Sequence, residues 1–234
     1  MIGQNFPTNI SKKRIFLLSV PIFFANLAIP FTGIVDTGLM GNLGETRFLA
    51  ATSIATSVMT MIIWSFGFLR MGTVGIVAQL FGKSDYREIA KTLLRNFFIA
   101  IIIGVVIILF KPIIVNSTKY FFSISVETQE LINTYISIRV LSVPAELITY
   151  ILVGFYLGIQ KTKISSLLVI TMSILNIVLS SFFVLSLNLN VFGVALGTLI
   201  SSYITAVIFS LYTYNFIVKK FQIIPTFQKL IVPS

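Results

Sequence analysis

Residues 97–110 read FFIAIIIGVVIILF and contain no charged or hydroxyl-bearing side chain. The hydrocarbon core of a bilayer is about 30 Å thick, and roughly 20 apolar residues of α-helix cross it. The apolar run continues on both sides to cover residues 93–115. This stretch therefore predicts a membrane-spanning helix, and it decides the class of fold.

The remainder of the chain repeats this pattern. Of its 234 residues 56% are hydrophobic and 10% are charged, and the mean hydropathy is +1.00, whereas soluble domains contain about 25% charged residues. We therefore predict an all-α integral membrane protein, a bundle of about six transmembrane helices. The predicted spans are residues 15–40, 49–70, 93–115, 131–159, 164–187 and 191–218.

The predicted domain organisation is one lobe, residues 1–222, followed by an apolar tail or truncated linker, residues 223–234. The first apolar run is too long for a secretory signal and is interpreted as an uncleaved span. The second run continues beyond Arg70 to Phe81, which is more helix than a bilayer needs. We expect it to tilt, to break near Gly72 and Gly75, or to emerge as an interfacial segment.

Charge is distributed unevenly between the two sides of the predicted bundle. The net charge is +10, and the connections taken alternately place twelve Lys and Arg on one side and three on the other. Positively charged loops stay in the cytoplasm during insertion, which predicts a multi-pass protein of the cell (inner) membrane with both termini cytoplasmic. The basic pI is then a sign of topology, and no nucleic-acid partner is expected.

The chain contains neither cysteine nor histidine. It therefore has no thiol nucleophile, no imidazole proton shuttle and no metal site built on these ligands, and no carboxylates are paired at a useful spacing. An enzyme is the least favoured class, and no cofactor is expected.

Polar groups inside the spans are the candidate functional residues, because a charge in hydrocarbon is costly. Asp36 lies in the first span, six residues after Pro30, which removes a backbone donor and loosens the helix. A carboxylate beside a loosened backbone is typical of cation or proton sites in membrane helices. The alternative is that Asp36, near Gly41, faces water at the outer interface.

Other polar residues recur at helical spacing in the later spans. Arg139 and Glu146 lie two turns apart on one face, and these charges, with Arg70, form either a polar cleft or a helix-packing seam. Asn176 and Ser180 share a face of the fifth span, and Thr198 lies in the sixth. For such small and hydroxylated residues, helix packing is the commoner role.

Four stretches resemble the multidrug and toxic compound extrusion (MATE) transporters, and in particular their DinF branch. Residues 18–41, LSVPIFFANLAIPFTGIVDTGLMG, resemble the first helix of that family, and residues 68–83, FLRMGTVGIVAQLFGK, resemble the end of its second helix. Residues 175–179, LNIVL, and 192–201, FGVALGTLIS, are similar to its fifth and sixth helices. The resemblance covers nearly the whole chain and implies the amino-terminal half of such a transporter.

The resemblance implies a secondary antiporter that exports cationic or amphiphilic small molecules in exchange for Na⁺ or H⁺. It assigns the coupling cation to Asp36, Asn176 and Thr198, with Na⁺ at Asp36 as the possible metal. Where the family usually has an aspartate, this chain has Ser180, so a weaker Na⁺ site is expected.

Family members have about twelve spans in two lobes, whereas this chain has about six. Alternating access needs two bodies, so we expect a homodimer or a separate second lobe as partner, within the lipid bilayer. Two alternatives stay open. One is a lipid or polysaccharide flippase, and the other is an inactive half-transporter or membrane scaffold from a truncated or split gene.

Overall fold

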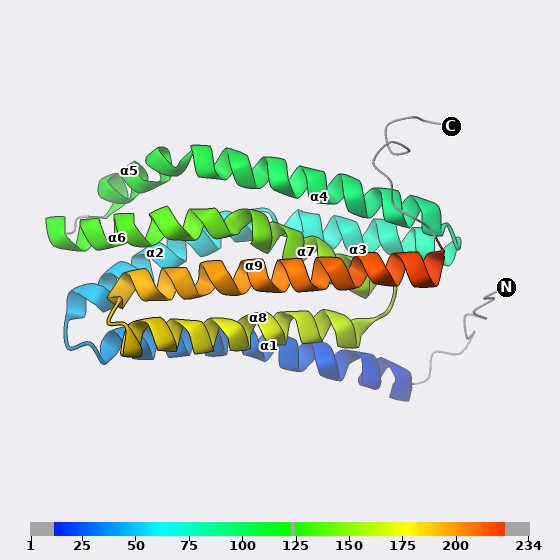
Figure 1. Cartoon of the computed structure of the whole chain (residues 1–234), viewed down its shortest axis with the longest axis horizontal. Helices are drawn as coiled ribbons and strands as arrows, with labels where there is room; N and C mark the ends of the chain where they lie inside the picture. The colour runs from blue at the N-terminus through cyan, green and yellow to red at the C-terminus, as the bar shows by residue number, and fades with distance from the viewer. Residues whose placement is uncertain (1–11, 123–124, 223–234) are drawn as a thin grey trace.

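A computed structural model describes residues 12–122 and 125–222 (Figure 1). The described chain is helical without a strand, and six of its helical segments are long and apolar enough to cross a membrane. The predicted all-α membrane bundle is confirmed; the predicted tail, residues 223–234, lies outside the described residues. The main helices are α1 (Lys12–Gly41), α2 (Thr46–Ser65), α3 (Gly67–Gly82), α4 (Tyr86–Leu109), α5 (Lys111–Phe121), α6 (Val126–Arg139), α7 (Val143–Gly158), α8 (Thr162–Ser181) and α9 (Asn190–Phe216).

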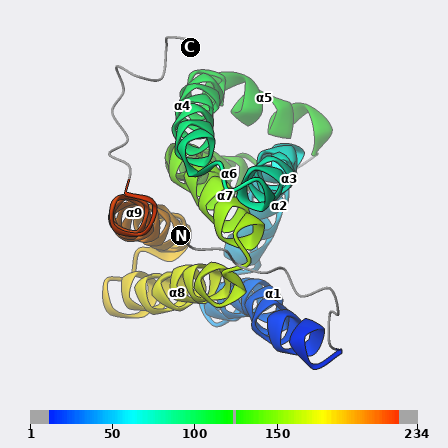
Figure 2. The same ribbon diagram turned by 90° about the vertical axis from the view of Figure 1, so that its right-hand side faces the viewer.

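The long helices run side by side along the long axis and form two groups (Figure 2). In one group α1 packs on α8 and α8 packs on α9, while the other contains α2, α3, α4, α6 and α7. Helix α7 contacts α3, α4, α8 and α9, and its Leu147, Ile151 and Phe155 are fully buried. The two groups therefore share a core centred on α7.

The second apolar run breaks at Phe66, so the expectation of a break near Gly72 and Gly75 is wrong. The Phe66 backbone, at φ −96° and ψ 13°, separates α2 from α3, whereas Gly72 and Gly75 remain helical. Close packing explains the difference, because a Cβ added to Gly154 of α7 would lie 2.7 Å from the Arg70 carbonyl oxygen. Small residues allow such backbone approach between membrane helices, and α3 continues as a helix through this contact with α7.

Two other predicted spans are also interrupted, both beside prolines. The third span ends at Leu109, and the separate helix α5 begins at Lys111 with Pro112 in its first turn, where proline is favoured. In the fourth span a 3₁₀ turn, Val140–Ser142, precedes α7 and its Pro144. Helix α4 packs onto the first turn of α7 at Gly104, where an added Cβ would lie 2.6 Å from Pro144 Cγ.

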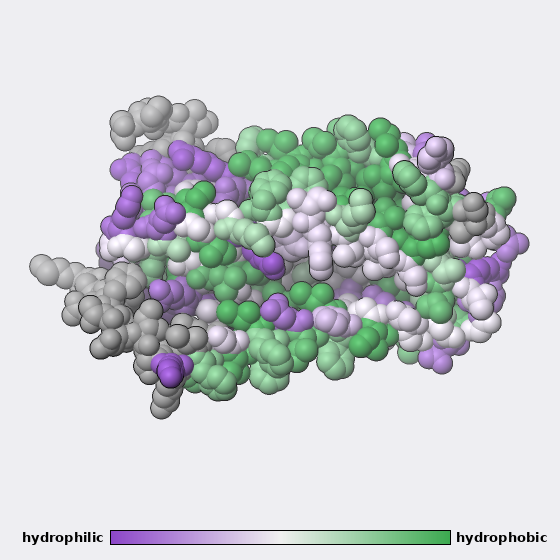
Figure 3. All heavy atoms as spheres, turned by 180° about the vertical axis from the view of Figure 1, so that it is seen from behind, coloured by the Kyte–Doolittle hydropathy of each residue, from purple (hydrophilic) through white to green (hydrophobic). Residues whose placement is uncertain are grey.

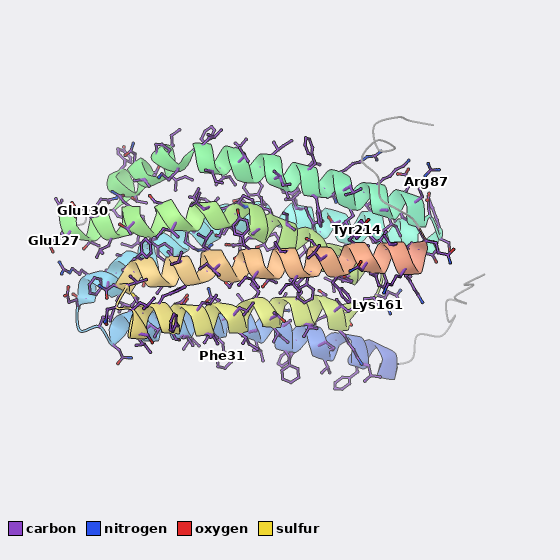
Figure 4. The ribbon with its side chains drawn as sticks, in the orientation of Figure 1. Phe31, Arg87, Glu127, Glu130, Lys161 and Tyr214 are labelled. Carbon is purple, nitrogen blue, oxygen red and sulfur yellow. The ribbon has the colours of Figure 1, made fainter. Side chains whose placement is uncertain are left out.

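Apolar side chains cover the outside of the bundle, and polar side chains are buried within it. Phe31 is 59% exposed and points outward from α1 (Figure 4), whereas Ser201, Ser202 and Thr205 of α9 are fully buried. This arrangement reverses that of a soluble protein and suits a bundle surrounded by lipid.

Basic side chains gather at the end of the bundle where α1 begins and α9 ends. Figure 4 shows Arg87 and Lys161 at this end, and Glu127 and Glu130 at the opposite end. The charge asymmetry expected from the sequence is thus present in the structure, while its direction across a membrane stays a prediction. The described cations at the basic end are Lys12, Lys83, Arg87, Lys91, Arg95, Lys161, Lys163, Lys219 and Lys220, and those at the other end include Arg47 and Lys111.

Candidate cation site

Asp36 lies on the last two turns of α1, near the end of the bundle opposite the termini. Its side chain is half-buried, and its Oδ1 atom is enclosed without a hydrogen-bond partner among the described residues. The carboxyl lies within interaction range of the Ser180 hydroxyl on α8, the helix against which α1 packs. One carboxylate oxygen is therefore held inside the α1–α8 contact.

Asn176 and Thr198 form a direct hydrogen bond between α8 and α9. The Asn176 amide Nδ2 donates to Thr198 Oγ1 over 2.7 Å, and the Thr198 hydroxyl donates to the Val194 carbonyl oxygen over 3.1 Å. Both side chains are more than nine-tenths buried. This arrangement uses the amide donor of Asn176 and leaves its Oδ1 atom without a partner in the described chain.

Ser180 lies one turn beyond Asn176 on α8 and is completely buried. Its backbone is pressed against Gly197 of α9, where an added Cβ would lie 2.7 Å from the Ser180 nitrogen. The Ser180 Oγ atom is buried, and no described residue gives it hydrogen-bond geometry. Gly197 thus allows α9 to approach closely enough to fix the position of the serine.

Three buried oxygens, Asp36 Oδ1, Asn176 Oδ1 and Ser180 Oγ, therefore lack a hydrogen bond of ordinary geometry within the described residues, although the Asp36 carboxyl and Ser180 lie within interaction range of each other, where α1 and α9 pack against α8. A buried oxygen without a partner costs free energy, so such a group is either strained or serves a ligand. Oxygen ligands of this kind suit a hard cation. If Asp36 instead binds a proton, the neutral oxygens can accept a hydrogen bond from its carboxylic acid group. No cluster of three or more metal-ligating Asp or Glu side chains occurs in residues 12–122 and 125–222.

Arg139 and Glu146 form a buried ion pair at the junction of α6 and α7. The Arg139 Nη1 atom donates to Glu146 Oε1 and to Ser142 Oγ, and the Ser142 hydroxyl lies 2.6 Å from Glu146 Oε1. The charges therefore meet across two helical turns because both side chains reach over the intervening 3₁₀ turn. The Asp36 carboxyl lies within electrostatic range of Arg139, so the pair also affects the candidate site.

Tyr135 is a neighbour of this cluster that the sequence reasoning missed. It is 2% exposed, its hydroxyl accepts a hydrogen bond of 2.9 Å from Thr56 Oγ1, and it interacts electrostatically with Arg139 and Asp36. Tyr135 precedes Arg139 by one helical turn, and this spacing was the signal available in the sequence.

Arg70 lies apart from the Asp36 cluster. Its guanidinium carbon lies 5.6 Å from the centroid of the Tyr150 ring, and it lines a cavity together with Asn26 and Ser166. The structure therefore brings together Asp36, Asn176, Ser180 and Thr198, with Arg139 and Glu146 nearby, and separates Arg70 from them.

The class of protein to which this six-span helical lobe belongs follows from comparisons with known proteins. The sequence model of the MatE family matches residues 21–182. The chain belongs to the MatE family, as its resemblance to MATE transporters predicted.

The chain is 32% identical over 198 residues to DNA damage-inducible protein F of Escherichia coli K12, covering 85% of this chain and 43% of that protein. It is 25% identical over 200 residues to the multidrug export protein MepA of Staphylococcus saprophyticus, covering 86% of this chain and 44% of that protein. The chain thus spans less than half the length of these relatives.

Solved structures show the same fold. An outward-facing multidrug resistance MATE family transporter aligns with a TM-score of 0.81 at 23% identity, over 93% of this chain and 47% of that one. A transporter of the MOP superfamily from Pyrococcus furiosus gives the same TM-score, identity and coverage. The described bundle therefore has the fold of about half of a MATE transporter.

Proposed function

We propose that the chain is one lobe of an ion-coupled antiporter that exports cationic or amphiphilic compounds as Na⁺ or H⁺ enters. The observation that carries this proposal is the group of unpartnered oxygens of Asp36, Asn176 and Ser180 inside the α1–α8–α9 packing. Membership of the MatE family supports export, and relatives that match the chain include proteins named as multidrug exporters.

The coupling cation binds at Asp36, with neutral oxygens from Asn176, Ser180 and Thr198 completing the site. The single carboxylate of Asp36 balances the charge of one monovalent cation, and Ser180 contributes no second negative charge. Arg139 adds a positive charge within range of the same carboxyl.

The lobe lies in the inner membrane of the cell, with both termini in the cytoplasm. The basic end of the bundle, marked by Arg87 and Lys161 in Figure 4, supports this orientation. The opposite end, where Asp36 lies, then faces the outside, from which the coupling ion enters.

Transport requires a second lobe, either another copy of this chain or a different partner. Rocking of one six-helix body against another gives alternating access in transporters built from repeats. The bundle has a recess on the face formed by α1, α2 and α3, where Figure 3 shows hydrophilic side chains between hydrophobic bands. A facing lobe would cover these polar groups, which are costly to expose to lipid.

Efflux of ethidium from liposomes containing the full 234-residue chain tests this proposal. An inward gradient of H⁺ or Na⁺ is imposed at two protein densities, one at which photobleaching shows monomers and one at which it shows dimers. We expect ion-driven efflux in the dimer preparation and none with Asp36→Asn. Efflux that is equal in monomers and dimers, or unchanged by Asp36→Asn, would contradict the proposal.

A further inference from the structure

A cavity lies in the half of the bundle nearer the termini, away from Asp36. The cavity has a volume of about 480 Å³ and lies between α1, α3, α7 and α8. This volume is within the range of small-molecule sites, which are roughly 300–1,000 Å³ and mostly apolar with a few polar groups. Its polar lining consists of Asn26, Arg70, Ser165 and Ser166, and its apolar lining includes Val74 and Val153.

Arg70 gives this cavity a positive charge that the described protein does not neutralise. Its recorded partner is the Tyr150 ring, and no carboxylate in residues 12–122 or 125–222 lies within ion-pair distance of it. Arg70 is twelve residues from Gly82 at the end of α3, which is roughly 18 Å along the helix. A cation this far from the helix end is costly in a membrane unless it meets water or an anion.

Ser166 supplies a second, independent polar group. The residue is 4% exposed, it lines the cavity, and its Oγ atom is buried without a hydrogen-bond partner in the described chain. Its hydroxyl is therefore free to donate to a ligand. Ser165, also 4% exposed, lies beside it on the same wall.

We propose that this cavity binds the anionic head of an amphiphile, a carboxylate or a phosphate, with its alkyl chain against the apolar wall. The Arg70 guanidinium presents a planar fork of donors that matches both kinds of head group, and Ser166 and Asn26 add neutral hydrogen bonds. The ligand would therefore have the opposite charge to the cation bound at Asp36. A binding test on the purified chain needs neither transport nor a coupling ion, so failure of this proposal and failure of the proposed function are distinguishable.

Fluorescence titration of the purified full chain in a non-ionic detergent tests the site. The probe is 11-(dansylamino)undecanoic acid, and its neutral reference is the corresponding alcohol. We expect the acid to bind more tightly than the alcohol, and laurate or dodecyl phosphate to displace it. An alcohol that binds as tightly as the acid, or an acid that neither competitor displaces, would overturn the proposal.

Arg70→Gln should weaken binding of the acid by about tenfold or more and leave the alcohol unchanged, because a charge-assisted hydrogen bond is lost. The matched control is Arg95→Gln, which removes the same charge from a side chain that is 56% exposed on α4 and should change neither affinity. Equal affinity of the acid for Arg70→Gln and wild type would overturn the proposal. Gel filtration and thermal melting establish that each variant is folded.

Two further variants keep the test decisive if Arg70→Gln does not fold. Arg70→Lys retains the charge and should retain the preference for the acid over the alcohol. Gly75 lines the cavity, and a Cβ added there meets no atom within 4 Å, so Gly75→Leu should fill the cavity without a backbone clash. We expect Gly75→Leu to weaken both probes; unchanged binding of both would place the ligand elsewhere and overturn the proposal.

Discussion

Gly197→Ala is the substitution whose effect the structure defines most closely. The added Cβ would lie 2.7 Å from the Ser180 nitrogen and 2.9 Å from the Ser180 Cα, both of them backbone atoms. Backbone atoms cannot rotate away as the end of a flexible side chain can, so α8 and α9 must separate. This displacement would move Ser180 and weaken the hydrogen bond from the Asn176 amide to the Thr198 hydroxyl oxygen.

Overpacking of this kind typically costs about 1–3 kcal/mol. In a helix interior, alanine is intrinsically better than glycine by about 1 kcal/mol, which offsets part of that cost. For a chain of this size, each kcal/mol lowers the melting temperature by roughly 2–4 °C. We therefore expect Gly197→Ala to melt up to roughly 8 °C below wild type in detergent, as followed by circular dichroism.

Gly72→Ala is the matched control, because a Cβ at Gly72 meets no atom within 4 Å and the residue is also inside a helix. It should melt at or above the wild-type temperature. Gly193→Ala should be intermediate, since its Cβ would lie 3.1 Å from the Phe183 Cβ. If Gly197→Ala is as stable as Gly72→Ala, the close contact between α8 and α9 is not present and the reasoning fails.

Three further predictions concern the charges and the topology. Glu146→Leu should lower the free energy of unfolding by about 3–5 kcal/mol, because Arg139 is left buried and unpaired. The double variant Glu146→Leu, Arg139→Met should recover most of this loss, and a denaturation series measures both effects. Single cysteines at Lys220 and Glu127 should react with impermeant maleimide from the cytoplasmic and outer sides respectively; the reverse pattern would invert the topology. Ser180→Asp should raise Na⁺ affinity in a radioactive sodium binding assay, and a lower affinity would contradict the role given to this position.

The sequence predicts the number of spans well because bilayer thickness sets the length of an apolar run. It predicts the helix interruptions less well. Pro112 and Pro144 each lie beside a break, in keeping with local chemistry, whereas the break at Phe66 is marked in the sequence only by Gly67, a weaker signal than proline. Gly72 looks like a weak point in sequence but is held helical through the packing of α3 on Gly154, a contact between distant segments.

Helical spacing and family resemblance predict which residues form the candidate site, but not how their side chains are bonded. Spacing puts Asn176 and Ser180 on one face, but it does not show that the Asn176 amide donates to Thr198 and leaves its oxygen free. Tyr135 lies one helical turn before Arg139, so spacing could have placed it beside the arginine, whereas its hydrogen bond with Thr56 of α2 emerges only from tertiary packing. Arg70 could not be assigned to a separate cavity from sequence, because four helices form that cavity.

Carbodiimide modification of Asp36 tests the central claim, that this residue is the carboxylate of an enclosed cation site. Dicyclohexylcarbodiimide reacts with protonated carboxyl groups in apolar surroundings, and peptide mass spectrometry gives the rate at each carboxyl of the purified chain. Glu127, 70% exposed at the same end of the bundle, is the internal reference. We expect Asp36 to react faster than Glu127 at every pH tested. We also expect Na⁺ to slow the reaction at Asp36 and not at Glu127. The Na⁺ concentration needed for this effect should be lower in Ser180→Asp than in wild type. Equal rates at Asp36 and Glu127, or no reaction at Asp36, would contradict the account.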